Sequence, residues 1–318
     1  MTRTLVLLDD YQGVARDLAP WHELDGWQVR AVREHHPDED ALVADLADAT
    51  AVVAMRERTP FPRRVLTRLP RLELLVTTGA ANASIDVAAA RELGITVCGT
   101  RASAHAAPEL SWALLMSAVR DIPGQQAALR GGPWQTGVGR ELSGRTLGIV
   151  GLGKIGGRMA RYARAFGMEV VAWSEHLTAD RAAECGASLV SRHELFSRAD
   201  IATLHLRLSA RTQGIVGRAE LEALGPDGLL VNTARAGLVD TGALIAALSS
   251  GALGGAALDV HDEEPLPRGH PLLSAPRTLL TPHIGYVTRE QYATFYSDAC
   301  EDVRAWAHGT PVRVIEPS

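Results

Sequence analysis

The sequence predicts an α/β protein made of two domains, each built on a parallel sheet, and three observations support this prediction. The chain has 318 residues, which is enough for two domains that each bury a core. Short apolar runs alternate with helical patterns along most of its length, as is typical of parallel sheets. A glycine-rich turn at 151–156 stands between an apolar run and a helical pattern, the order that a nucleotide-binding unit requires.

The first 98 residues read as one such unit. Continuous apolar runs, such as the one at 5–8, indicate strands that are buried on both faces. We expect strands at 5–8, 29–32, 51–55, 74–77 and 95–98, and helices at 38–46 and 85–93. A long, strongly apolar helix is expected next, at 108–120.

The second unit contains the glycine-rich turn and further strands after it. We expect strands at 147–150, 170–173, 188–190, 201–205, 228–231 and 255–259. Asp240 is a good N-cap for a helix that continues to about residue 248. A last helix is expected at 289–306.

The turn has the pattern Gly151-x-Gly153-x-x-Gly156, and each glycine has a physical role in binding a dinucleotide. Gly151 permits the tight turn, Gly153 lets the backbone approach a pyrophosphate, and Gly156 lets the helix pack closely on the strand. The helix N-terminus offers free N–H groups and partial positive charge to the phosphates. This pattern also occurs in flexible loops, but the strands on both sides favour a Rossmann-like domain.

The residues after the next strand bear on the choice of cofactor. Ser174 stands where an aspartate would be most usual for NAD, and Glu175 follows it. A serine there often accompanies NADP, but a carboxylate next to the extra phosphate would be repulsive. We therefore expect NAD, with NADP as the alternative and a solvated loop charge as the other interpretation of Glu175.

Composition excludes several classes of function. The net charge of −5 and a pI near 6.1 give no reason to expect binding to nucleic acid or to an anionic membrane. No apolar run approaches the ~20 residues of a membrane helix, and the N-terminus lacks the apolar core of a signal peptide. Three widely spaced cysteines make no metal-binding pattern and suit a reducing compartment. We expect a cytoplasmic protein with no metal site.

Three side chains in the second half could together perform chemistry: Arg235, Glu264 and His283. Taken singly, each has an ordinary interpretation, as a surface cation, a solvated loop acid and a structural imidazole. Together, a guanidinium can hold a carboxylate through two hydrogen bonds. A histidine can carry a proton, and a carboxylate can favour the charged form of that histidine.

At these positions the chain resembles the D-isomer-specific 2-hydroxyacid dehydrogenases, which include phosphoglycerate, glycerate, D-lactate and hydroxypyruvate/glyoxylate dehydrogenases. The resemblance covers essentially the whole length. Its motifs are the glycine turn, Asn232-Thr-Ala-Arg-Ala-Gly237, Leu258-Asp-Val to Glu264-Pro265-Leu266, and Thr281-Pro-His-Ile-Gly285. The order Arg, Glu, His with its spacings is that of the family.

The resemblance implies two similar Rossmann-like or flavodoxin-like domains with a cleft between them, and usually a homodimer. Residues 1–98 with 289–318 would form the substrate domain, and 99–288 the NAD-binding domain. By the resemblance, Arg235 binds the substrate carboxylate and carbonyl, His283 is the general acid/base, and Glu264 is its partner. Arg56, Gly79 and Ala80 would bind substrate. The residues implied in cofactor binding are Gly151, Gly153, Lys154, Ile155, Gly156, Ser174, Glu175, His205, Thr233, Ala234, Asp259 and Gly285.

The expected function is therefore transfer of hydride between NAD(H) and a small 2-hydroxy or 2-keto acid. A nucleotide-sensing, corepressor-like binding protein of the same fold is the alternative from another class, because fold does not fix function. A formate or phosphite dehydrogenase is a third interpretation. A substrate panel that includes 2-keto acids, formate and phosphite would separate them.

Overall fold

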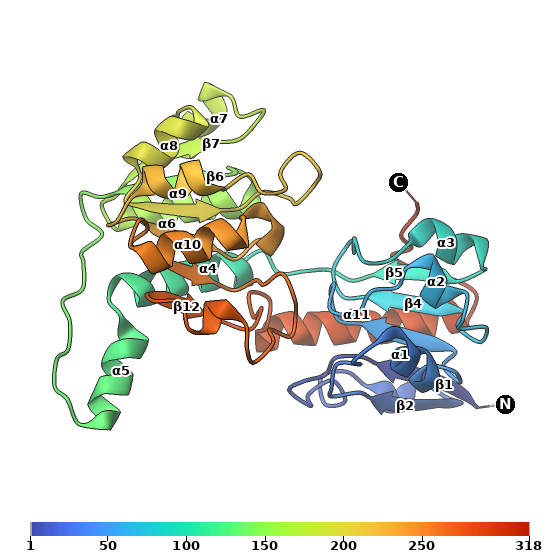
Figure 1. Cartoon of the computed structure of the whole chain (residues 1–318). Coiled ribbons are helices and arrows are strands. Elements are labelled where there is room, and N and C mark those ends of the chain that lie inside the picture. Colours follow the sequence, from blue (N-terminus) through green and yellow to red (C-terminus); the bar gives the residue numbers. More distant parts are fainter. Residues whose placement is uncertain (1, 318) are drawn as a thin grey trace. The chain divides into compact units, whose positions relative to one another are not determined.

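The computed structural model describes residues 2–317 and divides the chain into two compact units (Figure 1). Unit 1 comprises Met1–Ser103 and Val287–Ser318, and unit 2 comprises Ala104–Tyr286. Each unit is built on one parallel sheet, so the expected fold class is confirmed.

Unit 1 has a five-stranded sheet in the order β2-β1-β3-β4-β5. Its strands are β1 (Arg3–Leu7), β2 (Trp27–Ala31), β3 (Ala51–Ala54), β4 (Leu74–Thr77) and β5 (Thr96–Gly99). All residues of β3 and β4 are buried, which explains their continuous apolar sequence. The strand order reverses next to β1, and ligands of open α/β sheets bind at the carboxyl ends of strands near such a point.

The helices of unit 1 are α1 (Glu39–Asp45), α2 (Arg63–Leu66), α3 (Val87–Glu92) and α11 (Arg289–Ala307). Asp38 and Asp86 cap α1 and α3, and Thr288 caps α11, each by accepting a backbone N–H. After α11 the chain returns to β5, where Ile315 N donates to Val97 O over 2.8 Å. The last helix and the C-terminal segment are therefore part of the N-terminal unit.

Unit 2 has a seven-stranded sheet in the order β12-β11-β10-β9-β6-β7-β8. The strands are β6 (Thr146–Val150), β7 (Glu169–Trp173), β8 (Ser188–Leu189), β9 (Ile201–Leu204), β10 (Leu229–Asn232), β11 (Gly255–Leu258) and β12 (Thr278–Leu280). The longer helices are α4 (Ala106–Val119), α5 (Ile122–Gly131), α6 (Lys154–Ala165) and α10 (Thr241–Ser250). Three shorter ones are α7 (Ala179–Glu184), α8 (Arg192–Arg198) and α9 (Arg218–Leu224).

Neighbouring residues of β6 point to opposite faces of this sheet. Ile149 packs in a cluster with residues of α4 and α6, whereas Val150 packs with residues of α8, α9 and α10. Both faces are therefore covered by helices, as in a doubly wound domain. Within residues 2–317, no helix is long and apolar enough to cross a membrane.

The expected strands are all present, within one or two residues of their predicted bounds. The sequence prediction did not include β12, α2, α5, or the short helices α7, α8 and α9. Most of these are shorter than two turns, too short to show helical periodicity, and α5 buries no residue at all.

Candidate active site

The glycine turn joins β6 to α6 and leaves an open space at the start of the helix. Gly151 has φ +99°, and a Cβ there would lie 2.8 Å from the carbonyl of His205. A Cβ on Gly156 would lie 2.1 Å from the carbonyl oxygen of Gly151, so only glycine allows this close contact. At Gly153, by contrast, a Cβ would meet nothing within 4 Å.

This arrangement fits a dinucleotide. Gly153 is the N-cap of α6, and no side chain caps the helix there, so its first N–H groups remain available to an anion. Lys154 and Ile155 are exposed at the first two helical positions. An uncapped helix start with no side chain over it suits a pyrophosphate.

The neighbouring strands present the other residues expected to bind cofactor. Gly151 N donates to Trp173 O over 2.8 Å, so the end of β7 lies beside the turn. Ser174 and Glu175 follow directly, and Glu175 is exposed. Burial lowers the pKa of His205, which follows β9, to about 3, so its ring is neutral at physiological pH.

His283 and Glu264 form a close pair. Nδ1 of His283 lies 2.6 Å from Oε2 of Glu264, and Oε1 of the same carboxylate accepts the N–H of His261 over 2.9 Å. Burial opposes ionisation of Glu264, but the hydrogen bonds and charges of His283 and His261 together outweigh it and lower the pKa of Glu264. The carboxylate is therefore ionised at neutral pH and can stabilise an imidazolium.

Asp259 holds the loop that carries His283. This carboxylate, fully buried after β11, accepts hydrogen bonds from the Thr281 hydroxyl and from the backbone of Ile284 and Gly285, at 2.6–2.8 Å. His283 itself has φ +53°, an uncommon conformation for a non-glycine residue. These bonds hold the backbone on both sides of His283, and the contact with Glu264 holds its ring.

Arg235 follows β10, the neighbour of β11. Asn232, at the end of β10, shapes this turn by accepting the N–H of Ala234 over 3.0 Å and donating to Arg235 O over 2.9 Å. The hydroxyl of the preceding Thr233 pairs with that of Ser111 in α4. Arg235, Glu264 and His283 thus follow three neighbouring strands, β10, β11 and β12, at the same edge of the sheet.

Unit 1 contains the other expected residues, again at the carboxyl ends of neighbouring strands. Arg56 follows β3, and its Nη1 donates to Thr78 O over 3.0 Å, just after β4. Gly79 is buried and Ala80 is exposed in the same loop. Arg56 and the Gly79–Ala80 segment are therefore held together within unit 1.

Sequence reasoning missed His261. In addition to its backbone bond to Glu264, its ring Nε2 lies 2.9 Å from Thr281 O, two residues before His283. His261 therefore bonds both to Glu264 and to the segment that carries His283. The only signal was its position between Asp259 and Glu264, which does not reveal a contact to a residue 20 positions further on.

Unit 2 thus combines a helix start that suits a pyrophosphate with a paired histidine and carboxylate. These features place the protein in the class of nucleotide-binding α/β proteins with acid–base groups. Comparison with known proteins identifies the family. Residues 112–285 match the family described as "D-isomer specific 2-hydroxyacid dehydrogenase, NAD binding domain". The chain belongs to this family, and unit 2 contains its NAD-binding domain.

Individual proteins with similar sequences support this family assignment. The chain is 37% identical to a glyoxylate reductase from Aeropyrum pernix over 92% of this chain and 89% of that protein. It is 36% identical to a D-3-phosphoglycerate dehydrogenase from Methanocaldococcus jannaschii, over 85% of this chain but only 52% of that protein. The chain thus spans about half the length of that dehydrogenase.

Solved structures are similar across nearly the whole chain. A phosphoglycerate oxidoreductase from Vibrio cholerae is 40% identical with a TM-score of 0.92, covering 97% of this chain and 100% of that one. A glyoxylate reductase from Paecilomyes thermophila is 30% identical with a TM-score of 0.73, covering 99% of each chain.

Proposed function

We propose that this protein interconverts a small 2-hydroxy acid and the corresponding 2-keto acid with NAD(H). The observation that carries the proposal is the 2.6 Å contact between His283 and Glu264, which leaves Nε2 of the same ring for the substrate. Arg235 follows the strand beside that of Glu264, at the same edge of the sheet.

The start of α6 would hold NADH, which would supply the hydride in the direction of reduction. Protonated His283 gives its Nε2 proton to the carbonyl oxygen of the keto acid. Arg235 holds the carboxylate and stabilises the negative charge that develops on that oxygen. Glu264 stays ionised and orients the imidazole through Nδ1. In oxidation, neutral His283 takes the proton back.

The same proposal gives roles to the remaining residues. Arg56 and the Gly79–Ala80 segment contribute substrate-binding groups from unit 1. The glycine turn, with Lys154 and Ile155, binds the pyrophosphate. Ser174 and Glu175 bind the adenosine ribose. The nicotinamide side is lined by His205, Thr233, Ala234, Asp259 and Gly285.

We also propose that the protein is a homodimer that uses α5 and the segment after it. None of the residues of α5 is buried, and Figure 1 shows that α5 and the following segment extend from the body of unit 2. Leu129 is 59% exposed, Trp134 75% and Val138 100%. Apolar side chains gathered on one extended segment are typical of a surface that a partner covers, and a second copy of this chain is the partner that we propose.

A screen of NADH oxidation over glyoxylate, hydroxypyruvate, phosphohydroxypyruvate, pyruvate and bulkier 2-keto acids tests the enzymatic proposal. We expect reduction of at least one of them. Binding of NADH without reduction of any would contradict it and would favour the nucleotide-sensing alternative.

A further inference from the structure

The Gly79–Ala80 segment is held from one side by Thr100, which follows β5. Thr100 N donates to Gly79 O over 2.9 Å, and Gly79 N donates to the Thr100 hydroxyl over 2.7 Å. Thr100 is 2% exposed, so this pair of bonds is shielded from water. A single residue therefore fixes both polar groups of Gly79.

These two bonds determine which N–H group of the Gly79–Ala80 segment a ligand can use. The N–H of Gly79 is already donated to Thr100. In a trans peptide the C=O of one residue and the N–H of the next point in opposite directions, and the only cis peptide within residues 2–317 joins Glu264 to Pro265. Because Gly79 O faces Thr100, the N–H of Ala80 points away from Thr100, on a residue that is exposed.

The Thr100 hydroxyl is itself held in one orientation. It donates its only hydrogen to Arg101 O over 3.1 Å, so a lone pair remains directed at the N–H of Gly79. If the hydroxyl rotated, Thr100 would lose either this donated bond or the one that it accepts.

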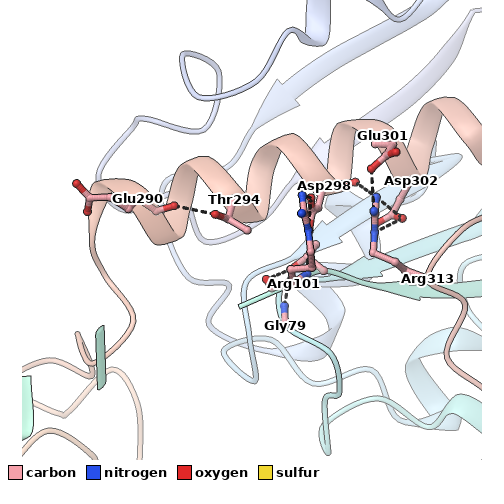
Figure 2. Close-up of polar contacts among 9 residues, drawn as sticks. Gly79, Arg101, Glu290, Thr294, Asp298, Glu301, Asp302 and Arg313 are labelled. Carbon is pink, nitrogen blue, oxygen red and sulfur yellow. Dashed lines mark hydrogen bonds and ion pairs between the residues drawn. The ribbon is translucent and has the colours of Figure 1, made fainter. Parts of the chain in front are cut away.

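Asp298 of α11 anchors Arg101 in turn (Figure 2). Its carboxylate is 1% exposed and accepts the backbone N–H of Arg101 over 2.8 Å and Nη2 over 2.7 Å. Burial would raise the pKa of Asp298, but the side-chain and backbone bonds from Arg101 lower it, so the carboxylate stays ionised. A buried charge bonded to both the backbone and the side chain of Arg101 fixes its peptide group firmly.

The other contacts of the loop lie on either side of this peptide. Thr78 Oγ1 accepts the N–H of Arg56 over 2.9 Å, and Asn82 Nδ2 donates to Arg56 O over 2.6 Å. These bonds hold the two ends of the loop, whereas Thr100 holds the Gly79–Ala80 peptide between them.

We propose that Thr100 and Asp298 are positioning residues for the substrate. Through Arg101, Asp298 fixes Thr100, and Thr100 directs the N–H of Ala80 toward the carboxylate of a 2-keto acid. This inference rests on the proposed function, and within the Gly79–Ala80 segment it assigns carboxylate binding to the N–H of Ala80.

The test replaces Thr100 by valine, which keeps the shape and the backbone N–H but removes the hydroxyl. We expect KM for the best 2-keto acid to rise about tenfold, which corresponds to the loss of one modest interaction, while kcat and the Kd of NADH stay within twofold. Thr100→Ser restores the hydroxyl and should restore KM. Thr96→Val makes the same chemical change at the other end of β5 and should leave KM unchanged.

Asp298→Asn tests the second step and also serves if Thr100→Val does not fold. It keeps the size of the side chain and one acceptor, and we expect KM to rise about threefold. In the double variant with Thr100→Val, KM should be no higher than in Thr100→Val alone, because both changes act on one peptide.

Two outcomes overturn the inference separately from the proposed function. Both apply when the wild-type enzyme is active. The first is an unchanged KM in Thr100→Val, or in Asp298→Asn if Thr100→Val does not fold. The second is a rise in KM in Thr96→Val equal to that in Thr100→Val. A wild-type protein that reduces no 2-keto acid contradicts the proposed function and this inference together.

Discussion

Nδ1 of His283 lies 2.6 Å from Oε2 of Glu264, and the two residues follow neighbouring strands of one sheet. The carboxylate is held on its other side by the backbone N–H of His261. Its geometry is therefore fixed independently of the histidine. Such an arrangement assigns one ring nitrogen of His283 to orientation and leaves the other for proton transfer.

Replacement of Glu264 by glutamine should change how the reaction depends on pH. Glutamine keeps the shape but removes the negative charge beside the ring, so the imidazolium loses its counter-charge. Reduction needs the charged ring and oxidation the neutral one. In profiles of kcat/KM, we expect reduction to fall off at lower pH in Glu264→Gln than in wild type, and oxidation to begin at correspondingly lower pH.

The pH profile of Glu263→Gln, in the neighbouring acidic residue, is the matched control and should not differ from that of the wild type. The Kd of NADH should be unchanged in both variants. Coincident profiles for wild type and Glu264→Gln would mean that Glu264 does not influence the proton carried by His283.

Arg235 should be required for catalysis, since it is proposed both to hold the carboxylate and to stabilise developing charge. In Arg235→Ala we expect kcat to fall by about 10²–10³-fold, as when an oxyanion donor is removed. Arg235→Lys should recover little, because a point charge does not replace a planar fork. Steady-state kinetics measure both variants. Arg207→Ala, at another arginine that follows a strand of this sheet, is the control. Activity within a few-fold of wild type in Arg235→Ala would refute this role.

Cofactor preference should depend on Glu175. This exposed carboxylate follows β7, whose end is bonded to the glycine turn, and it would repel the 2′-phosphate of NADP. We expect wild type to prefer NAD in kcat/KM, and Glu175→Arg to shift the ratio toward NADP by at least about tenfold. Glu184→Arg, the same charge reversal at the end of α7, should not shift the ratio. A wild-type preference for NADP would contradict the assignment.

The exposed segment after α5 should determine the oligomeric state. Trp134→Ser with Val138→Ser removes apolar side chains that are 75% and 100% exposed, so the fold should be unaffected. Light scattering after gel filtration should show a dimer for wild type and a monomer, or at least a tenfold weaker dimer, for the double variant. Leu93→Ser, at an apolar residue 43% exposed in unit 1, is the control. If wild type is monomeric at micromolar concentration, the proposal fails.

Much of the fold could be predicted because strands buried on both faces leave an unambiguous signature. The run at 74–77 was expected as a strand and is β4 (Leu74–Thr77). Helix α5 (Ile122–Gly131) could not be predicted in this way, because a helix that buries nothing has no apolar periodicity. Its proline and two glycines even indicate a break.

Some parts of the candidate site could also be predicted from the sequence, whereas others could not. The glycine turn could be predicted because its residues are consecutive, and the resemblance supplied the pairing of Glu264 with His283. The contacts of His261 and Thr100 could not be predicted from sequence. His261 contacts Thr281 because β11 and β12 are neighbouring strands. Thr100 contacts Gly79 because β4 and β5 are neighbouring strands. Pairs of this kind depend on strand order, which local patterns do not encode.

The stability of the protein should depend on Asp302, which lies one helical turn after Asp298 in α11 (Figure 2). Asp302 is fully buried, and only one of its carboxylate oxygens contacts Arg313, with Nε at 3.1 Å. Burial raises the pKa of Asp302 to about 7, although Arg313 acts in the opposite direction. An unfolded aspartate titrates near 3.8, so between these two pH values the folded state binds more protons than the unfolded state.

The free energy of unfolding should therefore fall as pH rises through that window, because stability decreases with pH wherever the folded state holds the extra proton. Asp302→Asn does not titrate. We expect its Tm minus that of wild type to increase by about 5 °C between pH 5 and pH 8 and then to level off, since ~1–2 kcal/mol shifts Tm by several degrees in a domain of this size. Glu290→Gln, which removes an exposed carboxylate at the start of the same helix, is the control, and its Tm difference from wild type should stay constant over the same range. A constant difference for Asp302→Asn as well would show that Asp302 is already ionised in the folded protein at pH 5.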